Sequence, residues 1–127
     1  MVLVDTSIWV SHLRGGNSRL QKLLQQGKVV SHPFIIGELA CGNISNRTEI
    51  ISLMQSLPML DVIQTEELLL FIDHNKIMGT GLGFVDVHLM AAAAVAEVPL
   101  WTQDKKLKQT CARLSIDFSA HRNQNIL

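Results

Sequence analysis

The chain has 127 residues, of which 47% are hydrophobic and 17% charged, and its 11 basic and 11 acidic side chains leave a formal net charge of zero. A length of this size predicts one domain spanning residues 1–127. The composition excludes a disordered chain, and the neutral charge argues against binding of nucleic acid by broad phosphate neutralisation, although a local basic edge is compatible with it.

Neither targeting segments nor a cysteine framework is visible in the sequence. The first residues lack the basic and long apolar regions of a signal peptide, and the apolar stretch at 89–96 is far shorter than the ~20 residues of a membrane span. We therefore expect a cytoplasmic protein without membrane contact. Cys41 and Cys111 form no C-x-x-C pair, so we expect neither zinc nor a disulfide, and both should be small buried hydrophobic side chains.

Short apolar runs alternate with helical patterns along the whole chain. The runs predict strands at 2–4, 28–31, 59–63 and 99–102, with a weaker fifth at 115–119. The intervals predict helices at 6–13, 18–26, 34–41, 48–57, 66–78, 85–97 and 105–114, with Asn17, Ser18, Pro33 and Thr65 as helix-start signals. This alternation predicts an α/β fold, a three-layer α/β/α arrangement with a mainly parallel sheet of four to five strands.

Most of the 11 acidic side chains have ordinary surroundings. Polar neighbours or helix ends predict solvated charges or helix-dipole partners, and Asp61, inside the third strand run, is compatible with a position facing water. The other solvated acids on this interpretation are Glu49, Glu66, Glu67, Asp73, Glu97 and Asp117.

Four acidic residues are placed differently. Asp5 directly follows the apolar run VLV, and Asp104 follows the strand pattern PLWT by one residue. Asp86 stands where a glycine-rich loop, whose glycines let the chain turn, enters the helix GFVDVHLMAAAAVA. Glu38 lies inside FIIGELACG, which predicts a helix that is apolar nearly all round. Carboxylates are rarely buried without a partner, so these four call for a shared explanation.

The predicted topology gives them a common location. Ligands of open parallel sheets bind beyond the carboxyl ends of the strands, where all four acids could converge. Two like charges ~4 Å apart repel by about 4 kcal/mol at an effective dielectric near 20, so such a cluster would hold protons or a cation. Oxygen ligands alone favour Mg²⁺ or Mn²⁺ over zinc, and the hydroxyls of Thr6, Ser7 and Thr102 could orient the carboxylates or coordinating waters.

A simpler explanation remains open for three of the four. Asp5, Asp86 and Asp104 each stand where an N-cap residue is expected, and a cap needs no metal. Glu38 has no capping role because it lies in the middle of its helix. His88, two residues after Asp86, could be a ligand or proton donor, but packing at the helix start is the more common role of such a histidine.

With these residues identified, the chain resembles the PIN-domain ribonucleases, and among them the VapC toxins of bacterial toxin–antitoxin pairs. The matching pieces are VDTSIWV, HPFIIGELACG, GLGFVDVHLMAAA and LWTQDKKL, in this order and at familiar spacings. Together they anchor most of the chain up to about Leu114, whereas residues 43–78 and the last dozen match only in pattern.

The resemblance implies an endoribonuclease that depends on one or two Mg²⁺ or Mn²⁺ ions and inhibits translation or growth by cleaving RNA. Asp5, Glu38, Asp86 and Asp104 fall on the acidic positions of the family, and Thr6, Ser7 and Thr102 fall on its hydroxyl positions. It also implies a homodimer and a small VapB-like antitoxin whose C-terminal segment blocks the acidic groove, where an arginine would match the carboxylates in charge.

RNA contacts and rival functions stay open at this point. Lys105, Lys106 and Lys108, just after Asp104, could hold phosphates, and so could Arg14 and Arg19, but each could equally belong to a solvated helix face. A receiver-like Mg²⁺-binding signalling domain fits the size and the sheet, although it would need two adjacent acids after the first strand. A non-catalytic interaction module would leave Glu38 unexplained.

Overall fold

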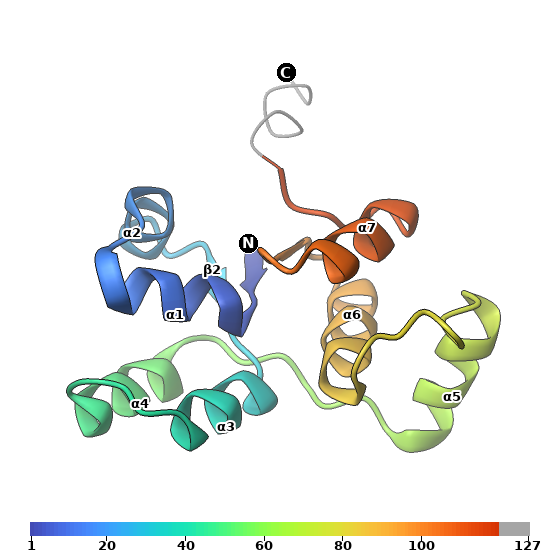
Figure 1. Ribbon diagram of the computed structural model, residues 1–127, viewed down its shortest axis with the longest axis horizontal. Coiled ribbons are helices and arrows are strands. Elements are labelled where there is room, and N and C mark those ends of the chain that lie inside the picture. The colour runs from blue at the N-terminus through green and yellow to red at the C-terminus, as the bar shows by residue number, and fades with distance from the viewer. Residues whose placement is uncertain (120–127) are drawn as a thin grey trace.

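The computed structural model describes residues 1–119, and within this range it contains seven helices and three short strands (Figure 1). In chain order these are β1 (Val2–Val4), α1 (Thr6–Gly15), α2 (Ser18–Gln25), β2 (Val29–Val30), α3 (Pro33–Cys41), α4 (Arg47–Ser56), α5 (Thr65–His74), α6 (Phe84–Ala96), β3 (Leu100–Trp101) and α7 (Lys105–Arg113).

All seven predicted helices are confirmed, and their ends have identifiable causes. Asn17 caps α2 by accepting a hydrogen bond from the Leu20 N–H at 2.9 Å, and Pro33 occupies the first turn of α3. Thr65 is the first residue of α5 instead of its cap, which is Gln64. The same helix ends at His74, earlier than predicted, because Lys76 takes a left-handed conformation with φ of 54°.

The sheet is parallel, with β1 between β2 and β3. It has three strands where we expected four to five. The two outer runs each contribute one isolated parallel bridge, Ser31 with Met59 and Leu100 with Asp117. The sheet stays narrow because β2 is followed almost at once by Pro33, which lacks an N–H and begins α3, so the run at 59–63 finds a partner only at Ser31.

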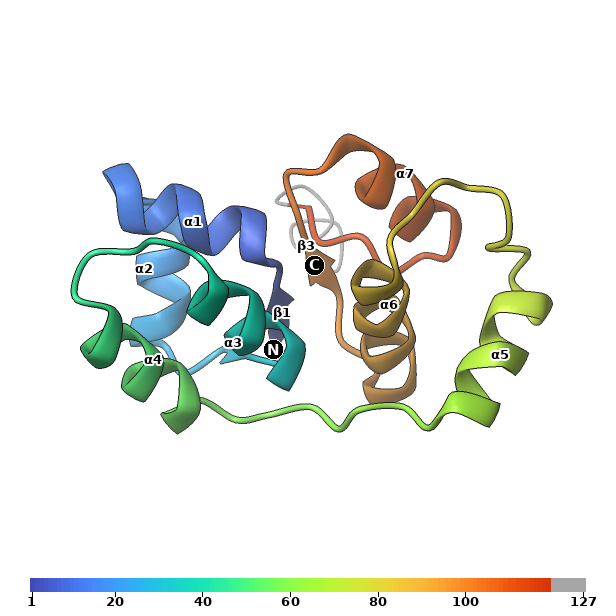
Figure 2. The same cartoon turned by 60° about the horizontal axis from the view of Figure 1, so that its bottom comes forward.

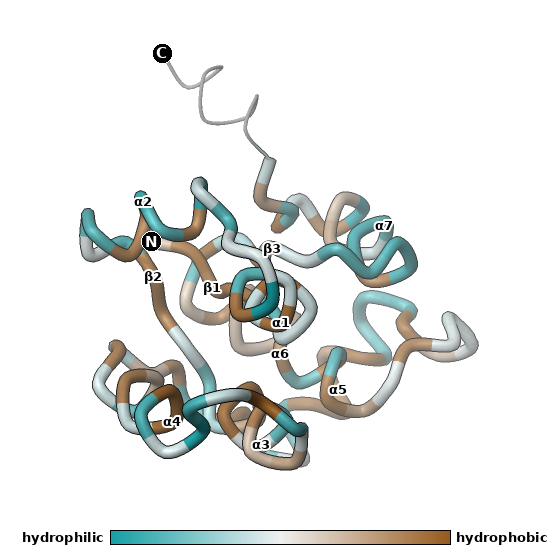
Figure 3. Tube along the Cα trace, turned by 60° about the vertical axis from the view of Figure 1, so that its left-hand side comes forward, coloured by the Kyte–Doolittle hydropathy of each residue, from teal (hydrophilic) through white to brown (hydrophobic). Residues whose placement is uncertain are grey.

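Helices cover both faces of this sheet, which confirms the three-layer arrangement. In Figure 2, α1 to α4 lie on one side of the strands and α5 to α7 on the other. Figure 3 shows α1 in front of β1 and α6 behind it, with β1 and β2 brown and α7 mostly teal. Within residues 1–119, no helix combines the length and the apolar character that crossing a membrane requires.

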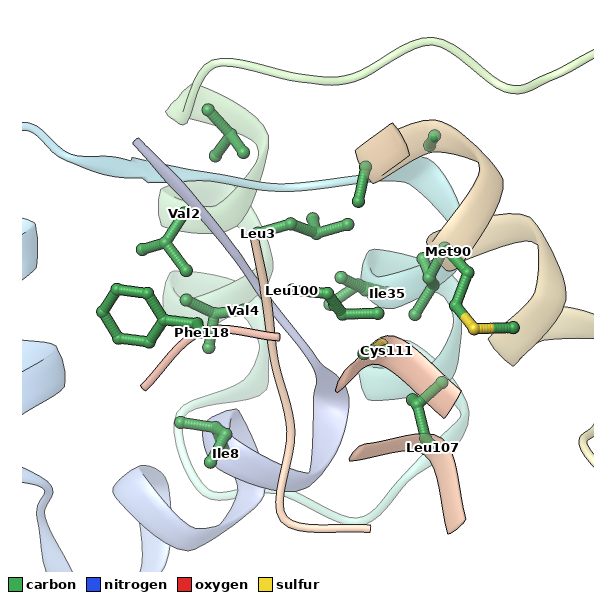
Figure 4. Close-up of a cluster of buried hydrophobic side chains, with 14 of the residues drawn as sticks. Val2, Leu3, Val4, Ile8, Ile35, Met90, Leu100, Leu107, Cys111 and Phe118 are labelled. Atoms are coloured by element: carbon green, nitrogen blue, oxygen red, sulfur yellow. The ribbon is translucent and has the colours of Figure 1, made fainter. Parts of the chain in front are cut away.

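The hydrophobic core lies between these layers. Figure 4 shows side chains of β1, α3, α6, β3 and α7 meeting there, among them Leu3, Ile35, Met90 and Leu100. The alanines of α6 explain how this helix lies so deep, because residues 87–93 are all buried and small side chains allow close approach to the sheet. Burying one leucine or valine is worth about 1.5–3 kcal/mol, so this contact fixes the position of α6 firmly.

The three strands all end at the same edge of the sheet. Asp5 directly follows β1 and its N–H donates to the Trp101 carbonyl of β3 at 2.9 Å. Thr102 directly follows β3, and α3 begins three residues after β2. The three carboxyl ends therefore point to one edge of the sheet, which we call the carboxyl edge.

Candidate active site

Asp5 is the buried acid of the carboxyl edge. Its side chain is only 6% exposed. Its Oδ2 accepts hydrogen bonds from the Ser7 hydroxyl at 2.8 Å, the Thr102 hydroxyl at 2.7 Å and the Ser7 N–H at 3.4 Å. Asp5 is therefore the N-cap of α1, but two hydroxyl donors exceed what a cap requires. They hold the carboxylate in one orientation, and none of the three donors uses Oδ1.

The same two hydroxyls connect α1 to the segment after β3. Ser7 Oγ accepts from the Gln103 N–H at 3.0 Å, and Thr102 Oγ1 accepts from the Asp104 N–H at 3.0 Å. The two hydroxyl oxygens are 3.3 Å apart. Because each hydroxyl donates to Asp5 and accepts from a backbone N–H of this segment, the two hydroxyls tie Asp5 to the segment that carries Asp104.

Asp104 and Glu38 are exposed carboxylates with one hydrogen bond each. Asp104 Oδ1 accepts from the Leu107 N–H at 3.0 Å and caps α7. Glu38 was expected inside an apolar helix, but it lies on the exposed side of α3. The Thr6 hydroxyl donates to Glu38 Oε1 at 2.6 Å and ties α3 to the first turn of α1.

Asp86 is the acid that the others act on. It lies in the first turn of α6, and the N-cap residue of this helix is Gly83, so Asp86 is not the N-cap that the simpler explanation required. Burial raises the pKa of Asp86 from 3.8 to about 6, and the charges of Asp5, Asp104 and Glu38 add to this shift against a Gly83 backbone hydrogen bond that lowers it. The structure therefore brings all four predicted acids within electrostatic reach of one another.

This donor set fits a hard divalent cation. Within residues 1–119, no three His, Cys, Asp or Glu side chains converge closely enough to form a ready three-ligand cluster. Mg²⁺ does not need one, because it keeps several waters and is usually bound by one or two carboxylates together with substrate phosphates. A cation at this edge would offset the repulsion between the carboxylates, which adds to the effect of burial in raising the pKa of Asp86.

The comparison with known proteins decides the family. The sequence model of the PIN-domain family matches residues 2–113, which include all four acids. The chain belongs to the PIN-domain family.

Two relatives extend this PIN-domain assignment along almost the whole chain. Both are called Ribonuclease VapC32, from the CDC 1551 / Oshkosh and ATCC 25618 / H37Rv strains of Mycobacterium tuberculosis. Each is 39% identical over 117 residues, which cover 91% of this chain and 94% of the relative. This PIN domain is thus of the VapC type. The family assignment rules out the receiver-like signalling domain that the sequence analysis left open.

A solved structure supports the same fold. The crystal structure of PAE2754 from Pyrobaculum aerophilum matches this chain with a TM-score of 0.59. The match covers 90% of this chain and 94% of the other at 18% sequence identity, so it speaks for the fold alone.

The lysines that the sequence analysis named as possible phosphate contacts lie directly after Asp104. Lys105 and Lys106 are exposed in the first turn of α7, directly after Asp104. The Lys106 amino group lies close to Gly81, where a Cβ would approach it to 2.9 Å, and Gly81 has a φ of +80°. The glycine loop before Asp86 thus turns as predicted and leaves room for Lys106.

The two arginines near the first helix lie elsewhere. Arg14 is in the last turn of α1, so ~13 Å of helical rise separates it from Asp5. The Arg19 guanidinium lies over Phe118, 4.4 Å from the ring centroid, and 5.2 Å from that of Trp101, and burial lowers its pKa. Arg19 is thus part of the packing and not a free phosphate contact.

Two buried histidines flank the site. His88 is buried between phenylalanines, with centroid distances of 4.5 Å to Phe84 and 4.9 Å to Phe34, and burial lowers its pKa. His32 caps α3 through Nδ1, which accepts from the Phe34 N–H, and its pKa is lowered to about 4, mainly by burial and also by His88. Packing, the more common role, accounts for His88.

Two further sequence expectations about burial are wrong. Cys41 is exposed instead of buried, whereas Cys111 is buried as predicted and burial raises the pKa of its thiol to about 12. Asp117 was expected in solvent but is 7% exposed, because its run pairs with Leu100 at the sheet edge.

Sequence reasoning also missed Phe84, an exposed aromatic ring two residues before Asp86. It borders a depression of about 740 Å³ between α3 and the start of α6, which we call the α3–α6 groove. A phenylalanine in the first turn of the helix that carries Asp86 was the available signal. The groove is lined by Thr6, Pro33, Phe34, Gly37, Glu38, Cys41, Phe84 and Val85.

Proposed function

We propose that this protein is a metal-dependent endoribonuclease that cleaves RNA phosphodiester bonds and acts as the toxin of a toxin–antitoxin pair. The observation that carries the proposal is the gathering of four carboxylates at one edge of the sheet, where burial first, and then the charges of Asp5, Asp104 and Glu38, raise the pKa of Asp86 to about 6. Perturbed carboxylates of this kind are typical of catalytic sites. The 39% identity to proteins named Ribonuclease VapC32 supports RNA as the substrate.

Asp5 and Asp86 are the proposed direct ligands of Mg²⁺ or Mn²⁺, and Asp104 and Glu38 would bind a second ion or act through water. Such an ion supplies a water of lowered pKa and neutralises charge on the scissile phosphate. Ser7 and Thr102 hold Asp5 in place through their hydrogen bonds to Oδ2. Thr6 does the same for Glu38 through its bond to Oε1.

Lys105 and Lys106 are the proposed phosphate contacts of the RNA. They follow Asp104 directly and are exposed, so a strand that reaches the carboxylates passes near their amino groups. A neutral chain needs such a local basic edge, because it lacks the overall charge that would attract RNA. Arg14, at the far end of α1, would contact only an RNA that extends along this helix.

Two partners belong to this proposal. An antitoxin segment with an arginine would match the exposed carboxylates Glu38 and Asp104 in charge and compete with the metal. A second copy of the chain would cover the apolar side chains that α4 and α5 expose, such as Leu53 and Leu70. We further propose that the protein acts in the cytoplasm, where it would meet an RNA substrate.

The proposal is tested by incubating partner-free protein with labelled transfer and ribosomal RNAs in Mg²⁺, Mn²⁺ or chelator. We expect discrete products that vanish with chelator and with Asp86→Asn, which removes one charge with little change of shape. Products that persist in chelator would contradict the metal dependence. A folded, partner-free wild type that cleaves no RNA of the panel would favour a binding role instead.

A further inference from the structure

The α3–α6 groove has a rigid aromatic wall. Phe84 is 67% exposed, yet its ring is held at one side by the buried His88 at a centroid distance of 4.5 Å and an interplanar angle of 82°. Phe34 contacts the same histidine from α3 at 4.9 Å. Because His88 is buried and fixed between the two rings, Phe84 is presented to solvent in a defined position.

The groove is continuous with the carboxyl edge. Thr6 and Glu38 line it and are hydrogen bonded to each other, and the Glu38 charge acts on Asp86. Phe84 itself is two residues from Asp86 on the same helix. An RNA strand with a phosphate at the carboxylates therefore has a neighbouring nucleotide at the mouth of the groove.

We propose that the α3–α6 groove receives one unpaired RNA base next to the cleaved phosphate, with Phe84 as its stacking surface. This rests on the proposed nuclease function and adds a substrate determinant to it. Aromatic rings stack on bases without selecting one base strictly, and only bases outside a duplex are free to enter such a groove. Glu38 and Thr6 contribute the side-chain oxygen atoms of the groove lining.

Cleavage kinetics with base-deleted substrates test the proposal. Stacking on one aromatic side chain is worth about 1–3 kcal/mol per base, so Phe84→Ala should raise KM roughly 5- to 150-fold, and Phe84→Trp should restore it. Removing the base at one position flanking the cleavage site should cost the wild type a similar factor and cost Phe84→Ala almost nothing further. Val95→Ala, on the same helix and 64% exposed, is the matched control and should behave as wild type.

The groove assignment would be overturned if the Phe84→Ala substitution and the base deletions reduced activity independently of each other. A Phe84→Ala enzyme that still loses activity with every base deletion, as the wild type does, has lost something other than a stacking surface. In that case the nuclease function stands if the wild type cleaves and Asp86→Asn does not. If the wild type cleaves nothing, both the function and the groove assignment fail.

Cys41 provides a second readout that does not depend on cleavage. It lines the groove and is exposed, whereas Cys111 is buried, so a maleimide should label Cys41 selectively. Intact single-stranded RNA should slow this labelling at least several-fold, and the base-deleted RNA or Phe84→Ala should abolish the protection. Protection by a peptide of the antitoxin but not by RNA would overturn the proposal and assign the groove to a protein partner.

Discussion

The amino edge and the carboxyl edge of the sheet differ in how far their charged side chains are exposed to solvent. At the amino edge, a cavity of about 990 Å³ is lined by Lys22, Lys28 and Glu97, all of which are exposed to solvent. At the carboxyl edge, the adjoining groove is smaller, but Asp5 is buried and the pKa of Asp86 is raised to about 6. The larger hollow thus carries ordinary surface charges, whereas burial together with repulsion between carboxylates marks the candidate site.

The largest effect should come from neutralising acids at one edge and not at the other. Asp5→Asn and Asp86→Asn should each lower kcat/KM for RNA cleavage by more than about 100-fold, since loss of a direct ligand exceeds the ~10–100-fold typical of outer-shell partners. Glu97→Gln at the amino edge should cleave at the wild-type rate. Wild-type rates for both carboxyl-edge variants would contradict the assignment.

A smaller loss is expected when the hydroxyls that orient Asp5 are removed. Thr102→Val deletes a donor to Asp5 and an acceptor for the Asp104 N–H, so kcat should fall about 10–100-fold while Thr102→Ser retains most activity. Thr110→Val is the matched control, because it removes another buried hydroxyl, which within residues 1–119 bonds only to the Lys106 carbonyl. Equal losses in Thr102→Val and Thr110→Val would mean general destabilisation.

Helices and strand ends could be predicted from the sequence because they depend on local patterns and short-range caps. Asp5 and Asp104 stand at strand ends as expected, both cap the helices that follow them, and the charges of both act on Asp86. Glu38 was expected inside a helix that is apolar nearly all round, but it is exposed. The prediction failed because α3 presents apolar side chains to two different surroundings. Ile35 and Leu39 face the core, while Phe34 and Cys41 line the groove, which no periodicity distinguishes.

Reversing the charge of one lysine at each edge tests which edge contacts the RNA. Lys106→Glu should raise KM for RNA about two- to tenfold at low salt, because an exposed phosphate contact is worth little and is screened by ions. Lys28→Glu at the amino edge changes the net charge equally and should leave KM nearly unchanged. Equal effects of the two substitutions would indicate only long-range electrostatics.

The smallest effect concerns the stability of the metal-free protein. Because the pKa of Asp86 is raised from 3.8 to about 6 on folding, the folded state binds this proton more tightly than the unfolded state. The contribution of Asp86 to the free energy of unfolding is therefore most favourable below pH 3.8 and is lost as the pH rises through about 6.

Asp86→Asn should therefore gain stability relative to wild type between these pH values, on the order of 1 kcal/mol after solvent screening of this half-buried group. Urea unfolding in chelator at both ends of that pH range measures the difference. If wild type and variant change in parallel, folding does not raise the pKa of Asp86 as described.

Calorimetric titration of the partner-free protein with Mn²⁺ tests most directly whether the carboxyl edge holds a divalent cation. We predict binding by the wild type, unchanged binding by Glu97→Gln and loss of binding by Asp86→Asn. Absence of binding by the folded wild type, or equal binding by all three proteins, would contradict a metal site at this edge.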